Sequence, residues 1–143
     1  MKIDLDKIRK FKEYWILIAF ILCSLPFAKI SGSDIETKNI SMYYFRGVCP
    51  NVFYWGTLLL FVFTSLADKD IKILRFTKNT WVHILISILT IIAYYEMTYK
   101  MNDFIYDNIA VQRNIIYYLI YVFLFAYVIM NILEWILLKK KKR

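Results

Sequence analysis

Glycine, proline and histidine are scarce in this 143-residue chain, which has three, two and one of them respectively. A soluble domain of this size ordinarily has more glycine and proline in its turns and more charge on its surface. Hydrophobic residues instead make up 60% of the chain, and its mean hydropathy is +0.49. The composition therefore excludes an ordinary soluble domain and indicates an integral membrane protein.

Enzyme signatures are also missing. The chain has one histidine, no nucleophile motif, no phosphate-binding loop and no carboxylate pair at membrane depth, so hydrolase and nucleotide-driven activities are disfavoured. It has no CxxC motif and no Cys/His cluster. Cys23 and Cys49 belong to separate apolar segments, so a disulfide between them is disfavoured. We predict a protein that is not an enzyme and has no catalytic, cofactor-binding or metal-binding residues.

Four apolar segments follow one another, at about residues 14–30, 50–67, 80–98 and 114–138. Each approaches the roughly 20 apolar helical residues that cross a bilayer. The residues before the first segment are predicted to form an amphipathic lead-in on the membrane surface. A signal peptide is the alternative for that segment, but cleavage after Ala28 would place Pro26 at the −3 position, where a small residue is needed. We therefore predict an uncleaved first span.

The positive charge is grouped in short blocks between these segments. The net charge is +8, yet blocks of this kind are topology signals, and we expect the lipid bilayer as a partner and no nucleic acid. With both termini in the cytoplasm, the inner segments hold fourteen Lys and Arg residues and the outer loops hold five. The predicted fold is an all-α integral membrane protein. It is a single domain over residues 1–143, with four transmembrane helices in an antiparallel bundle and both termini cytoplasmic.

Polar side chains recur at helical spacing on the third and fourth segments. Because a polar group in a bilayer tends to face the bundle interior, we predict a polar seam between these segments, with His83 hydrogen-bonded to Glu134. The alternative is that both residues are solvated near the ends of their spans. The seam consists of His83, Ser87, Thr90, Tyr127, Asn131 and Glu134.

A second candidate site lies in the first outer loop, just before the second segment. Two tyrosines, a phenylalanine and an arginine gather there, and aromatic residues with arginine are typical of recognition surfaces. The alternative is ordinary anchoring at the membrane interface. The predicted recognition residues are Tyr43, Tyr44, Phe45 and Arg46.

The layout resembles the larger immunity proteins of pore-forming colicins. The resemblance rests on four spans, a longer first outer loop, a lysine-rich end, Phe45, Arg46 and Pro50 before the second span, and Thr64 near its end. The sequence departs from that pattern in two ways. Gly47-Val48-Cys49 separate Arg46 from Pro50, and the interval from Pro50 to Thr64 is longer than in those immunity proteins. The resemblance implies a multi-pass inner-membrane protein that blocks a membrane-inserted toxin by helix–helix contact. The alternatives are an accessory or assembly subunit of a larger membrane complex and a small lysis protein.

Overall fold

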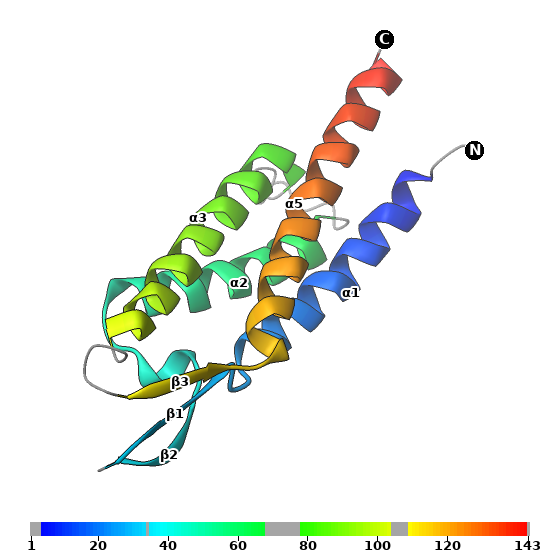
Figure 1. Cartoon of the computed structure of the whole chain (residues 1–143). Helices are drawn as coiled ribbons and strands as arrows, with labels where there is room; N and C mark the ends of the chain where they lie inside the picture. Colours follow the sequence, from blue (N-terminus) through cyan, green and yellow to red (C-terminus); the bar gives the residue numbers. More distant parts are fainter. Residues whose placement is uncertain (1–3, 34, 68–77, 104–108, 143) are drawn as a thin grey trace.

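Four long helices dominate the structure, a computed structural model that describes residues 4–33, 35–67, 78–103 and 109–142. The basic block between the second and third apolar segments lies mostly outside these ranges, Lys72 and Arg75 among it, while Lys78 is described. The helices run in the order α1 (Leu5–Cys23), α2 (Val48–Leu66), α3 (Thr80–Tyr99) and α5 (Ile115–Lys142), and both chain termini lie at the same end of the molecule (Figure 1).

Three of these helices are long and apolar enough to cross a membrane: Val48–Leu66, Thr80–Asn102 and Ile115–Lys141. The third of them is the most apolar. Helix α1 is not in this group, because ionisable residues such as Arg9 and Lys12 fill its first half. The described part of the chain is thus mostly helical, with three candidate membrane-spanning helices.

Helix α1 differs from the predicted 14–30 segment at both ends. It begins at Leu5, where Asp4 caps it by accepting a 3.1 Å hydrogen bond from the backbone N–H of Asp6. The charged lead-in is therefore continuous with the apolar half rather than a separate surface helix. The helix ends at Cys23, three residues before Pro26, which has no N–H to donate.

A small antiparallel sheet corrects the expectation of an all-α protein. Its strand order is β2-β1-β3, formed by Ala28–Gly32 (β1), Ile35–Ile40 (β2) and Ala110–Arg113 (β3). Ala28 pairs with Ile40 on one side and with Arg113 on the other, so the sheet joins two loops that are far apart in the sequence. Period-two burial along β1, with Ala28 and Ile30 inside and Lys29 outside, holds this register.

The sheet lies at the opposite end of the molecule from the two termini (Figure 1). The 3-10 segments η1 (Met42–Tyr44) and η3 (Lys100–Asn102) are short connections beside α2 and α3. A buried aromatic group lies near the sheet: the Tyr94 ring stacks on Phe53 at 5.0 Å and meets Phe27 edge-on at 5.8 Å. These contacts join α2, α3 and the segment that precedes β1.

Helix α1 packs against α2 and α5, and α3 packs against the same two helices. Helices α2 and α3 approach closely at Gly56, although the sequence has no GxxxG motif. A Cβ atom at Gly56 would overlap Thr90 Oγ1 of α3. One glycine opposite a small polar residue is therefore enough for close contact between these helices.

Candidate functional site

Seven polar residues drawn from all four long helices meet near the end of the molecule that carries the termini. We call them the four-helix polar cluster. Two come from α1, one each from α2 and α3, and three from α5: Arg9, Lys12, Thr64, His83, Tyr127, Asn131 and Glu134.

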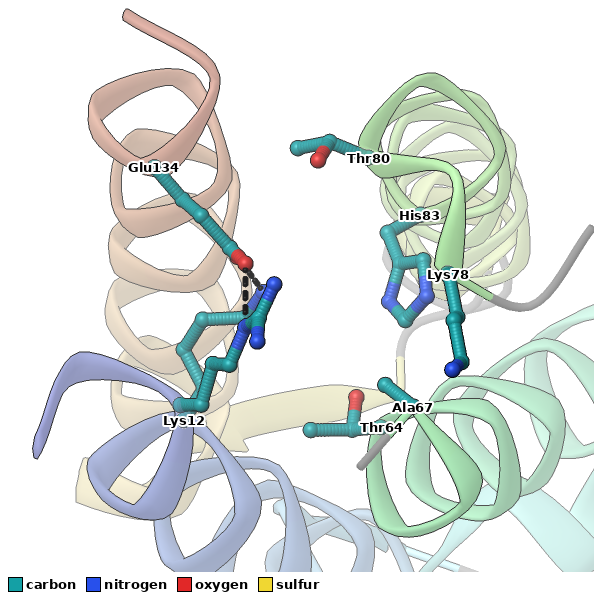
Figure 2. Close-up of a pocket in the computed structure, with 8 residues that line it drawn as sticks. Lys12, Thr64, Ala67, Lys78, Thr80, His83 and Glu134 are labelled. Atoms are coloured by element: carbon teal, nitrogen blue, oxygen red, sulfur yellow. Dashed lines mark hydrogen bonds and ion pairs between the residues drawn. The ribbon is translucent and has the colours of Figure 1, made fainter. Parts of the chain in front are cut away.

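A buried ion pair forms the first part of the cluster (Figure 2). Lys12 Nζ lies 2.5 Å from Glu134 Oε2, and the two side chains are only 6% and 7% exposed. Arg9 Nε donates to the other carboxylate oxygen at 3.0 Å, from a side chain that is 35% exposed. Lys12 Nζ also donates to Asn131 Oδ1 at 2.7 Å. Charge pairing and hydrogen bonds together offset the cost of burying Lys12 and Glu134.

A chain of neutral hydrogen bonds forms the second part. Asn131 Nδ2 donates to the backbone oxygen of Tyr127 at 2.8 Å. The Tyr127 hydroxyl lies 2.6 Å from Thr64 Oγ1 and 2.9 Å from His83 Nδ1. The cluster therefore continues from α5 to both α2 and α3.

The number of available protons assigns the direction of these bonds. Thr64 Oγ1 donates its only proton to the backbone oxygen of Leu60 at 2.6 Å, so it accepts from the Tyr127 hydroxyl. Tyr127 then has no proton for His83, and His83 Nδ1 must carry the hydrogen and donate to Tyr127. The bonds thus run in one direction, from α3 through α5 to the backbone of α2.

A cavity of about 20 Å³ lies between the ion pair and this chain (Figure 2). That volume accommodates about one water molecule, which requires roughly 10–15 Å³. Five residues of the cluster line it: Arg9, Lys12, Thr64, His83 and Glu134. Ala67, Lys78 and Thr80 complete the lining. Seven of the eight lining residues have polar or charged side chains, which suits one bridging water molecule.

Helical periodicity explains how the sequence directs these side chains inward. Lys12 begins the buried stripe of α1, which continues through Ile16, Ala19 and Cys23 at steps of three and four residues. On α5, Tyr127, Asn131 and Glu134 follow one another at steps of four and three, and all are buried. The two stripes face each other because α1 packs directly against α5.

All six residues of the predicted polar seam are buried, but their contacts differ from the predicted ones. His83 bonds to Tyr127, which is the direct side-chain link between α3 and α5 within the seam. The expected bond between His83 and Glu134 is not among the hydrogen bonds of the described residues, because both Glu134 oxygens face α1. Ser87 and Thr90 donate to carbonyl oxygens of α3 itself, at 2.6 and 2.7 Å.

Sequence reasoning missed the contributions of Arg9, Lys12 and Thr64. The charges of the first two were interpreted as a surface lead-in and a topology signal. The spacing of Lys12 from Ile16 and Ala19 was the available signal, because it places a lysine on the same face as the apolar side chains. Thr64 was noted only for the family resemblance, and no signal in α2 marked it as a partner of Tyr127.

The predicted recognition residues lie at the other end of the molecule, around η1. Tyr43 is 66% exposed and Tyr44 is 46% exposed, and Arg46 is also exposed. Phe45 is half-buried, with its ring parallel to that of Phe27 at 6.3 Å. A hollow of about 190 Å³ adjoins them, lined by Met42, Tyr43, Phe45, Pro50, Asn51 and Tyr54. Tyr43, Tyr44 and Arg46 therefore face outward, while Phe45 packs between Tyr44 and Phe27.

Neither site gathers a set of metal ligands within the part of the chain that the structure describes. No three His, Cys, Asp or Glu side chains converge there as metal ligands, and Cys23 and Cys49 are free thiols. Comparison with protein-family models, curated proteins and solved structures finds no match. What the polar cluster can do is bind four helices together through one paired charge and directed hydrogen bonds.

Proposed function

We propose that this chain is a four-span protein of the bacterial inner membrane that protects its host from a membrane-inserting, pore-forming bacteriocin. The observation that carries the proposal is the division of side chains on the helices. Large apolar side chains face outward on all four helices, while the polar residues of the cluster face inward and are paired. The outward-facing set includes Ile18, Ile21, Trp55, Leu59, Leu85, Leu89, Val122, Phe125 and Ile129.

The ion pair supports α1 as a fourth span. A 19-residue helix is about 28 Å long, close to the roughly 30 Å hydrocarbon core of a bilayer. Lys12 would be costly there as a lone charge, but Glu134 of α5 balances it. The other lysines of α1, Lys7 and Lys10, are exposed and lie nearer the end of the helix, where headgroups and water would be.

The excess of basic residues supports an orientation with both termini in the cytoplasm. Lys and Arg accumulate on the cytoplasmic side of membrane proteins, and α5 ends in a run of lysines. The sheet and the recognition residues Tyr43, Tyr44 and Arg46 would then face the periplasm, the side from which a bacteriocin arrives.

The protective mechanism that we propose is contact between the apolar surface of this protein and the helices that the toxin inserts. Association in a bilayer depends on close packing between helices, which an outward surface of Leu, Ile, Val and aromatic side chains can supply. The resemblance in layout to colicin immunity proteins supports a toxin as the partner. The polar cluster would keep that surface in one shape, so that the toxin meets a preorganised partner.

Challenge of sensitive bacteria with pore-forming toxins tests this proposal. Cells that express the chain should survive, and their potassium release after toxin addition should fall relative to cells with an empty vector. The panel should include the toxin, if any, encoded next to this gene. Toxin added under osmotic shock bypasses its receptor and importer, which separates protection in the membrane from a block of uptake.

Two other outcomes would count against the proposal. No protection against any toxin in the panel, together with a stable co-purifying partner and a growth defect on deletion, would favour an accessory subunit. Cell lysis on overexpression in the absence of toxin would favour a small lysis protein.

A further inference from the structure

Two tryptophans and a lysine form a contact on the outer surface of α3 and α5, near the end that carries the termini. The rings of Trp81 and Trp135 meet edge-on, with centroids 5.3 Å apart. Lys139 Nζ lies 4.1 Å from the centroid of the Trp135 ring, within the range of a cation–π interaction. This contact places a positive charge directly beside a pair of aromatic rings.

The charge of the last turns of α5 is not balanced within the described residues. Lys139, Lys140 and Lys141 are all exposed, and no ion pair joins them to an acidic side chain of the part that the structure describes. The nearest acidic residue in the sequence, Glu134, is already bonded to Arg9 and Lys12. Helix α3 begins at Thr80 beside this surface, which adds the positive end of a helix dipole.

The surface changes from apolar to charged in one direction along α5. On the face of α5 that carries Trp135, the exposed Ile132 lies one turn before it and Lys139 one turn after it. Leu85 continues the apolar part on α3, one turn after Trp81, and is 60% exposed. An anionic phospholipid has the same order of groups, with acyl chains, an interfacial backbone and a negative headgroup.

We propose that this surface is a binding site for an anionic phospholipid of the cytoplasmic leaflet. Lys139 binds the phosphate, and the neighbouring Lys140 and Lys141 add positive charge around the end of α5. The acyl chains lie against Ile132 and Leu85. A soluble acidic partner would match the lysines but would leave the apolar half uncovered, so a lipid is the better fit. The site does not depend on toxin protection. It does rest on the topology proposed above, which places both termini in the cytoplasm and this surface at the cytoplasmic leaflet.

Native mass spectrometry of the full chain in a neutral detergent tests the site. The protein is mixed with equal amounts of phosphatidylglycerol and phosphatidylcholine, and the lipid-bound species are compared. The wild-type protein should bind phosphatidylglycerol at least about fivefold more than phosphatidylcholine. The triple variant K139Q/K140Q/K141Q should reduce that preference to less than about twofold.

The matched control removes three exposed lysines from the opposite end, in the variant K29Q/K38Q/K100Q. It should keep the wild-type preference, and both variants should keep the helicity and melting temperature of the parent. An equal loss in the two variants, or an unchanged preference in the α5 variant, would overturn the proposal. Displacement of phosphatidylglycerol by a short polyglutamate peptide would overturn it too, because it would identify a surface for acidic protein.

Discussion

Lys12 and Glu134 are 122 positions apart in the sequence, yet Lys12 Nζ lies 2.5 Å from Glu134 Oε2 with both side chains buried. This pair connects the first helix of the chain to the last. It also balances the charge of Lys12 at the place where this side chain is buried. The stability of the helical unit should therefore depend on both residues together.

Removal of Glu134 alone should destabilise the protein more than removal of both partners. E134Q leaves the buried Lys12 charge unbalanced and should lower the free energy of unfolding by about 3 kcal/mol. K12M should cost less than E134Q, because Glu134 keeps its ion pair with Arg9. The double variant K12M/E134Q should cost less than the sum of the two single variants. Unfolding in mixed micelles with increasing SDS, followed by circular dichroism, measures these differences.

The exposed neighbour Lys10 supplies the control for this cycle, and K10M should change the unfolding free energy by less than about 0.5 kcal/mol. Additive effects of K12M and E134Q would contradict the proposed coupling across α1 and α5.

The hydroxyl of Tyr127 should be a second determinant of stability. The variant Y127F removes the group that accepts from His83 and donates to Thr64, so two buried polar groups lose a partner. We expect a loss of about 1–3 kcal/mol in the same unfolding assay. Y118F is the matched control, because Tyr118 lies on the same helix but is 58% exposed. Equal stability of the two variants would refute the directed hydrogen-bond chain.

The contact between Gly56 and Thr90 predicts that the stability cost of a methyl group at position 56 depends on the side chain at position 90. G56A should destabilise the protein by about 1–3 kcal/mol, because the new Cβ overlaps Thr90 Oγ1 and pushes α2 away from α3. In a T90A background the same substitution should cost clearly less, since the overlapping oxygen is gone. Thermal unfolding of the four proteins measures both steps. A cost that is the same in both backgrounds would show that another contact limits the helix approach.

Substitution of the exposed Arg46 tests toxin recognition without a change in folding. R46A should lower the toxin dose that expressing cells tolerate by about tenfold, if Arg46 is an energetically important contact. Its exposure predicts unchanged stability and expression. K29A, which removes an exposed charge from β1, is the control and should protect as well as the wild type. Full protection by R46A would remove Arg46 from the proposed recognition surface.

Local patterns in the sequence determined the positions of three helices to within a few residues. Their apolar runs each contain at most one charged residue, and a helix is specified by contacts three and four residues apart. The same periodicity identified the inward faces of α3 and α5, so that His83, Asn131 and Glu134 are buried as expected. The seam was therefore predictable as a set of buried positions.

Only the tertiary structure decided which side chains these residues meet. Glu134 is bonded to Arg9 and Lys12 rather than to His83, and β1 pairs with β3 across most of the chain. Such contacts depend on how distant helices are rotated and aligned against each other, and the residue spacing within one helix does not determine either. The sequence by itself determined which residues of α3 and α5 turn inward. The packing of α1 against α5 determined that Lys12 and Arg9, and not the histidine, pair with the buried carboxylate.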